Sequence, residues 1–289
     1  MFEAKIENKK GNILTLSQNE SDFQIIRITG LNPPNAQINT NNLAGIDGAK
    51  YNSSKLQTRQ IVITLKLNGW GTRVEDNRQM LYRYFPTKEW CKFYFKTDNR
   101  DVYIEGYAET LEVDLFQQSQ TMQIVILCPQ PYFKAMDMII DDISKVLKNF
   151  EFPFSINNDE PIPFSIIELN KITNVYNNSE SETGIIIEIE VLNNVNKIEI
   201  RNIDTGESFI LNYDFLPDDK IIIDTNRGQK SITLIREGIT FNLFTAIQKG
   251  SKFFQLSLGD NFFSYLADEG SSDASVHIVF KYYTLYRGV

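Results

Sequence analysis

Histidine, cysteine and surplus basic charge are scarce in this sequence, and each scarcity excludes a class of function. The 289 residues include one histidine, His277, and two cysteines, Cys91 and Cys128. Two cysteines cannot form the disulfide framework of a small secreted domain, and with one distant histidine they do not have the spacing of a zinc site. Both cysteines alternate with apolar residues in strand-like segments, which predicts reduced thiols in a core. We therefore expect neither a metal nor a cofactor.

Long apolar runs are also absent. No stretch reaches the roughly 18 apolar residues of a membrane-spanning helix, and the first residues mix charged with apolar side chains, so we expect neither membrane insertion nor a signal peptide. The formal net charge is -8, whereas tight binding of nucleic acid depends on Lys and Arg side chains that neutralise phosphates. A negative wall would instead suit a channel that DNA passes without sticking.

No known catalytic motif is present. His277 lies on a strand-like segment opposite its apolar neighbours, which predicts a place in solvent or at a subunit interface, and no G-x-S-x-G elbow accompanies it. Gly45–Gly48 does not follow the nucleotide-binding pattern G-x-G-x-x-G and is typical of a tight turn. The adjacent carboxylates of Asp141–Asp142 and Asp218–Asp219 are typical of solvated turns. The sequence predicts a protein that is not an enzyme.

Alternating apolar residues dominate the first half of the chain, and the length predicts two domains of about 150 residues each. Gln60–Leu67 alternates with the period of a strand, and Thr72–Phe85 has helical spacing that opens on a Thr72/Glu75 capping pattern and closes before Pro86. Further strands are expected at Cys91–Lys96, Val102–Ile104 and Met122–Cys128. We expect residues 1–137 to form an antiparallel sheet with one packed helix.

Short strands with turn residues between them fill the second half. Residues 138–150 are expected to be a linker, within a moderately helical segment at Met136–Phe150, and residues 151–289 a β-sandwich. The fold class is mainly β, with one or two short helices. Strands are expected at Ile185–Val191, Lys197–Ile203, Ser208–Leu211, Lys220–Ile223, Ser231–Ile235, Phe254–Leu258 and Val276–Tyr283.

Sandwiches of this size often bind carbohydrate, usually through an aromatic platform with polar groups around it. Both tryptophans, Trp70 and Trp90, lie in the first half, and the alternation assigns many Tyr and Phe residues of the second half to its core. A carbohydrate-binding adhesion module is nevertheless kept as the alternative function.

Several segments, in order along nearly the whole chain, carry a resemblance to a known family: Gly45–Ser54 with Arg59–Leu65, Arg78–Lys88, Thr97–Tyr107 with Leu127–Phe133, and Ile198–Glu207 with Ile222–Thr225 and Leu256–Asn261. Together they resemble the distal tail protein (Dit) family of tailed phages. With this resemblance, the alternative function is a carbohydrate-binding adhesion module of a tail tip or a tail-derived bacteriocin. Gln130 stands where Asp is common in the family. Each segment alone is weak, and their shared order carries the resemblance.

This resemblance implies a structural protein of the virion at the distal end of the tail, made in the bacterial cytoplasm. It implies a hexameric ring of the first domains, with galectin-like second domains projecting outward. The expected partners are the tail tube protein, the tip hub or tail-associated lysin, and receptor-binding or baseplate proteins, while DNA passes through the lumen without specific binding. The candidate subunit-interface residues are Arg59, Arg73, Arg78 and Arg83.

Overall fold

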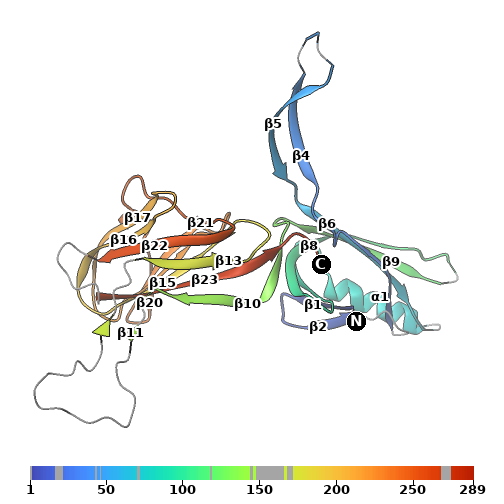
Figure 1. Cartoon of the computed structure of the whole chain (residues 1–289). Helices are drawn as coiled ribbons and strands as arrows, with labels where there is room; N and C mark the ends of the chain where they lie inside the picture. Colours follow the sequence, from blue (N-terminus) through green and yellow to red (C-terminus); the bar gives the residue numbers. More distant parts are fainter. Residues whose placement is uncertain are drawn as a thin grey trace, which may run out of the picture. The chain divides into compact units, whose positions relative to one another are not determined.

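The computed structural model divides the chain into two compact units (Figure 1). Unit 1 comprises Met1–Met136 with Leu285–Val289, and unit 2 comprises Asp137–Thr284. The chain therefore passes between the units at two places. The residues described are 2–16, 22–42, 44–45, 47–69, 72–117, 119–143, 146–147, 166–167, 172–267 and 275–289.

Unit 1 is built on an antiparallel sheet in which seven of the described strands pair in the order β2-β1-β7-β8-β9-β6-β3. Their bounds are β1 Glu3–Asn8, β2 Ile13–Leu16, β3 Phe23–Thr29, β6 Arg59–Leu67, β7 Trp90–Lys96, β8 Asp101–Val113 and β9 Thr121–Cys128. In β6 the side chains of Ile61, Ile63 and Leu65 are fully buried while their neighbours are not, as the alternation predicts.

One helix, α1 (Thr72–Tyr84), packs on this sheet through its last turns, as the sequence predicts. Leu81 is fully buried, and Phe85 directly after the helix stacks on Phe93 of β7 with ring centroids 6.3 Å apart. The apolar residues of the helix therefore join the sheet residues in one core. Cys91 and Cys128 belong to this core as free, buried thiols, which confirms the prediction.

Unit 2 is a β-sandwich, as predicted, of two antiparallel sheets whose inner faces share one core. One sheet orders β23 (Val276–Tyr286), β15 (Ile186–Val191), β18 (Lys220–Asp224), β19 (Ser231–Arg236) and β20 (Ile239–Asn242). The other orders β13 (Thr173–Asn177), β22 (Gly259–Ala267), β16 (Val195–Asn202) and β17 (Ser208–Phe215). Phe263 of β22 meets Phe280 of β23 edge to face at 5.1 Å, so aromatic packing joins the two sheets.

Smaller elements complete the described part of unit 2. They are the paired strands β14 (Thr183–Gly184) and β21 (Gln255–Leu256), the paired strands β11 (Val146–Leu147) and β12 (Ile166–Ile167), and a short 3-10 helix, η1 (Phe244–Ala246).

Two sequence predictions about segment boundaries are wrong. Residues 138–142 of the expected linker, and the start of the expected helix, lie in strand β10 (Phe133–Asp142). The apolar residues of this segment fit both the helical and the strand period, so the pattern alone does not distinguish a helix from a strand. Pairing with other strands favours the strand: Lys134 pairs with Tyr103 of β8, and Ile143 N–H donates to the Ile278 carbonyl.

The second wrong boundary concerns Phe254–Leu258, which was expected to be a strand ended by Gly259–Asn261. Only Gln255–Leu256 is a strand there, and Gly259 begins the long strand β22. The Asn261 side chain accepts a hydrogen bond from Ser257 N–H and donates one to the Ser257 carbonyl, at 2.8 and 2.9 Å. With Gly259 at a φ of 83°, these bonds close the turn at Ser257–Leu258 between β21 and β22.

Candidate interaction surfaces

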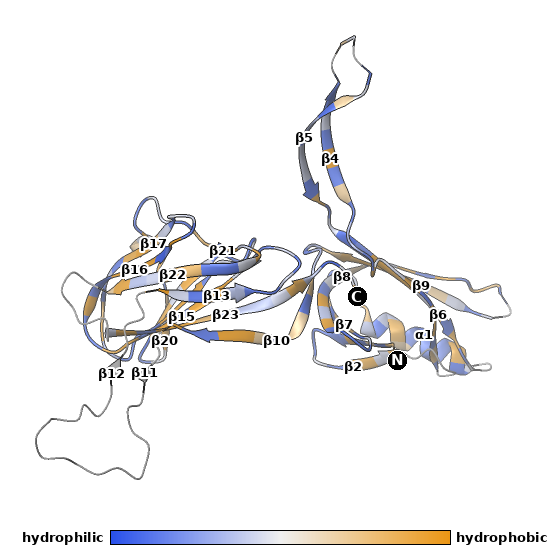
Figure 2. Cartoon of the chain, in the orientation of Figure 1, coloured by the Kyte–Doolittle hydropathy of each residue, from blue (hydrophilic) through white to orange (hydrophobic). Residues whose placement is uncertain are grey.

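A polar hairpin, formed by β4 (Ala36–Asn42) and β5 (Ala49–Leu56), extends away from the sheet of unit 1 (Figure 1). The two strands pair only with each other, and every residue in them is exposed except Leu56. Figure 2 shows mainly hydrophilic and neutral colours along both strands. No apolar face of this hairpin is covered by the described part of the chain.

The two exposed large apolar side chains of the hairpin, Ile38 and Tyr51, lie on the same face. Ile38 pairs with Ser54 and Thr40 pairs with Tyr51, and cross-strand partners point to one side of a sheet. Ile38 is 62% exposed and Tyr51 is 59% exposed, although the Tyr51 hydroxyl lies 2.9 Å from the Ser54 hydroxyl. The hairpin therefore has a small exposed apolar patch.

Gly45 and Gly48 lie in the tip of this hairpin with φ values of 78° and 92°. Such values belong to the left-handed region that glycine adopts without strain. The prediction of a turn at Gly45–Gly48 is therefore confirmed for its described residues, Gly45, Asp47 and Gly48, since β4 and β5 pair on either side.

Arg59, the first predicted interface residue, lies inside unit 1 with 3% exposure. Its guanidinium donates hydrogen bonds to four backbone carbonyls, and its Cζ atom lies 4.4 Å from the ring centre of Phe133. These carbonyls belong to Gly30, Asn32, Pro131 and Arg287. Burial lowers the pKa of Arg59, but its four acceptors satisfy the charged group. The structure thus makes Arg59 an internal clamp rather than a surface contact.

The other three predicted interface residues lie on α1 and differ in their partners. Arg73 is exposed and its Nη2 lies 2.8 Å from Asp22 Oδ1. Arg78 pairs with Glu75, one helical turn earlier, at 3.2 Å. Arg83 is exposed, and no ion pair of its side chain is seen among the described residues. The structure does not bring these residues together with Arg59.

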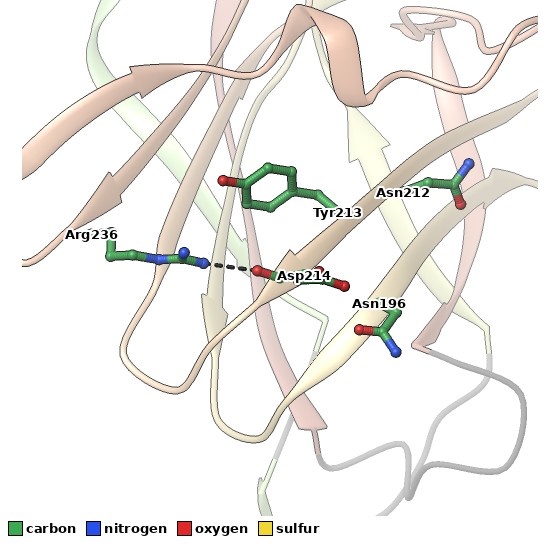
Figure 3. Close-up of a pocket in the computed structure, with 5 residues that line it drawn as sticks. All are labelled: Asn196, Asn212, Tyr213, Asp214 and Arg236. Atoms are coloured by element: carbon green, nitrogen blue, oxygen red, sulfur yellow. Dashed lines mark hydrogen bonds between the residues drawn. The ribbon is translucent and has the colours of Figure 1, made fainter.

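A pocket of about 550 Å³ opens on one edge of the sandwich in unit 2 (Figure 3). Its lining residues are Asn196, Asn212, Tyr213, Asp214 and Arg236. Such a volume is typical of ligand pockets. The register between β16 and β17 shifts here, because Val195 pairs with Phe215 whereas Lys197 pairs with Asn212. A β-bulge thus sets one residue against two, and bulges redirect side chains beside binding sites.

Tyr213 owes its exposure to this bulge. Strict alternation after the buried Phe209 and Leu211 would point Tyr213 into the core, yet it is 39% exposed. Its ring centre lies 5.7 Å from the guanidinium of Arg236 and 5.3 Å from the ring centre of Phe215. Two neighbours therefore hold an accessible aromatic ring in place.

Arg236 is fixed on the other side of the pocket by a buried carboxylate. Its Nε and Nη2 donate to the two oxygens of Asp219 at 2.8 and 2.6 Å, and Nη2 also donates to the Asp214 carbonyl at 2.9 Å (Figure 3). Burial acts to raise the pKa of Asp219, but hydrogen bonds from Arg236 and from Leu216 N–H outweigh burial and lower it. The same pair raises the pKa of Arg236. The two hydrogen bonds to Asp219 fix the orientation of the Arg236 guanidinium at the pocket.

Two thiols and one imidazole are among the other titratable groups that the sequence singled out. Burial and the nearby Glu89 raise the pKa of Cys91 to about 11, and burial raises that of Cys128 to about 12, so both thiols stay protonated at neutral pH. His277 is partly exposed, with Nε2 3.1 Å from Asp142 Oδ2. Within the described ranges, no group of three His, Cys, Asp or Glu side chains is placed to hold a metal ion, and no helix could span a membrane.

Comparison with known protein families gives two matches that lie one in each unit. Residues 12–128 match the phage tail protein RIFT-related domain, and residues 178–283 match the siphovirus-type tail component, C-terminal domain. Together they cover more than half of the chain. No curated protein matches the sequence.

Solved structures share this fold over nearly the whole chain. The Dit protein of phage SPP1, described as a hub adsorption apparatus of phages that infect Gram-positive hosts, is 13% identical with a TM-score of 0.70, over 97% of this chain and 98% of that one. Chains of the phage P2 baseplate in its activated conformation, with calcium and with strontium, are 12% and 11% identical. Both have TM-scores of 0.53 and the same coverage. The mainly β fold predicted from the sequence is therefore confirmed.

Proposed function

Since this chain belongs to the Dit family of siphovirus-type tail components, we propose that it assembles into a hexameric ring at the distal end of a phage tail. It is a Dit-like component of the distal tail or baseplate hub. In the proposed assembly, unit 1 forms the ring and unit 2 is available to other tip proteins. The role is structural rather than enzymatic.

The β4–β5 hairpin is the observation that supports assembly most directly. An isolated two-stranded hairpin is at best marginally stable in water, and this one packs against no other described element of its own chain. A ring is built from heterologous contacts, in which one surface of a subunit meets a different surface of the next. The Ile38 and Tyr51 face offers the apolar centre of such a contact.

The proposed partners follow from a position between the tail tube and the tip. The ring would bind the tail tube protein on one side and the tip hub or tail-associated lysin on the other, and receptor-binding or baseplate proteins would attach around it. DNA would pass through the lumen without specific contacts, in keeping with a formal net charge of -8.

Solution mass tests this proposal. Light scattering of the full chain, alone and with purified tail tubes, should give a hexameric mass, and negative-stain images should show rings with a central hole. The double variant Ile38→Asp, Tyr51→Asp should remain folded and lose the ring, because charges on an apolar contact oppose association.

The control is Ile239→Asp, which puts one such charge at a residue of unit 2 that is 58% exposed. It should assemble like the wild type. A wild-type chain that stays monomeric at all concentrations, even beside tail tubes, would contradict the ring. Rings of undiminished mass from the double variant would remove the hairpin from the interface.

A further inference from the structure

From the pocket at the bulge of unit 2 we infer a binding site for a neutral pyranose sugar, a property that goes beyond a structural role in the tail. The site consists of the Tyr213 ring, the Arg236 guanidinium, the Asn212 amide and the Asp214 carboxylate. Sugars are recognised where an aromatic ring covers their C–H face and fixed polar groups meet their hydroxyls. The β16–β17 bulge brings both kinds of group to one place.

The aromatic part is a single accessible ring. Tyr213 is 39% exposed, while Phe215 and Arg236 contact its ring. A pyranose can therefore stack on the ring while little conformational entropy is lost on the protein side. Although both tryptophans lie in the first half of the chain, the Tyr213 ring gives the second half an exposed aromatic surface.

The polar part is preorganised by groups outside the pocket. Asp219, 1% exposed, holds Arg236 by two hydrogen bonds, and the Asn212 amide donates to Gln248 Oε1 at 3.1 Å. The Asn212 carbonyl oxygen and the Asp214 carboxylate are acceptors for sugar hydroxyls, and Arg236 Nη1 is a donor. Hydroxyl groups both donate and accept, so a sugar matches this mixture of groups.

The charge balance selects a neutral ligand. Asp219 already neutralises Arg236, and Asp214 together with Glu237, which follows Arg236 in the chain, leaves a negative surplus around the pocket. A phosphate or a uronate would meet repulsion there and would not replace the paired Asp219. A neutral hexose pays no such cost.

Saturation-transfer NMR on the full chain tests the site with four probes: methyl α-glucopyranoside, methyl β-galactopyranoside, N-acetylglucosamine and, as the anionic counterpart, glucuronate. At least one neutral sugar should receive saturation and glucuronate should not. Tyr213→Ala should weaken the binding about tenfold, the loss expected for one aromatic contact. Asp214→Asn should keep the shape of the site and weaken binding through the lost charged acceptor.

Tyr176→Ala is the matched control, because Tyr176 is also exposed in unit 2 but lies on β13, away from the pocket residues. It should bind like the wild type. The inference is overturned if none of the neutral sugars receives saturation, or if Tyr213→Ala and Asp214→Asn both bind as the wild type does. Ring assembly is measured separately by light scattering and should be unchanged in all three variants, so a failure here leaves the proposed ring untouched.

Discussion

Two hairpins of this chain have similar glycine-containing turns but opposite fates. The β18–β19 hairpin of unit 2, with Gly228 in its turn, buries Ile221, Ile223 and Leu234 in the sandwich core. The β4–β5 hairpin of unit 1 buries none of its side chains. Glycine-containing turns favour both hairpins, but only β18–β19 has the apolar alternation that directs one face into a core. We propose that the β4–β5 hairpin, which lacks that pattern, packs against another chain.

Substitution of side chains that are buried within the chain should lower the free energy of unfolding. Substitution of exposed side chains that we assign to subunit contacts should change assembly alone. Since both tryptophans are in the first 136 residues, tryptophan fluorescence reports on the unfolding of unit 1.

The largest loss of stability is expected at Arg59. Arg59→Ala would leave four partly buried carbonyl hydrogen bonds without their donor and uncover the Phe133 ring, so unit 1 should lose about 4 kcal/mol in urea unfolding followed by tryptophan fluorescence. Arg83→Ala, at an exposed residue, is the control and should change stability by less than about 0.5 kcal/mol. Normal stability with lost assembly would restore Arg59 as a subunit contact.

The second largest loss of stability is expected in the buried β18–β19 hairpin. Ile223→Ala opens a cavity in the sandwich core and should cost unit 2 about 3 kcal/mol, measured by hydrogen exchange of peptides from Asp137–Thr284. The matched change in the uncovered hairpin, Ile38→Ala, should leave the stability of the monomer within about 0.5 kcal/mol. Equal losses at both positions would mean that β4–β5 packs against its own chain in solution.

A smaller effect with a clear pH dependence is expected at the wall of the pocket. Asp219→Asn should cost unit 2 about 2 kcal/mol at pH 7, because Arg236 loses its charged partner. The folded pKa of Asp219 is lowered, so the stabilisation is complete above the unfolded value of about 4 and disappears as the pH falls through the folded pKa. Hydrogen exchange should therefore show a gap between variant and wild type that narrows on acidification. A gap independent of pH would contradict this role.

The smallest effect on stability is expected on the exposed face of α1. Replacing Arg73, Arg78 and Arg83 together by Ala removes two exposed ion pairs and should cost the monomer no more than about 1 kcal/mol. We propose that some of these arginines pair with acidic groups of a neighbouring subunit. The triple variant should then assemble less well than the wild type at low salt, and the difference should shrink at high salt. Unchanged assembly at both salt concentrations would rule the pairing out.

The sequence predicted the parts of the fold in which local pattern and tertiary packing agree. Ile187 and Ile189 alternate along β15 and are buried in the sandwich, and Leu81 lies on the inner side of the predicted helix. The β4–β5 strands were missed because asparagine, serine and lysine give them no apolar period.

The functional features depend on contacts that no local pattern encodes. Arg59 reaches the carbonyls of Gly30 and Arg287, which lie 29 and 228 residues away along the chain. Tyr213 stands at a position that strict alternation gives to the core, and only the bulge between β16 and β17 exposes it. A one-residue irregularity in strand pairing has no signature in a single sequence.

The return of the chain to unit 1 at Leu285–Val289 makes unit 2 an insertion within unit 1. Arg59 and Arg100 hold the carbonyls of Arg287 and Gly288, and Val289 N–H donates to the Leu31 carbonyl. A pull on the sandwich is thus shared between two covalent connections, at 136–137 and at 284–285. Any exchange of the inserted domain must preserve both junctions, whereas a domain joined by a single linker needs only one.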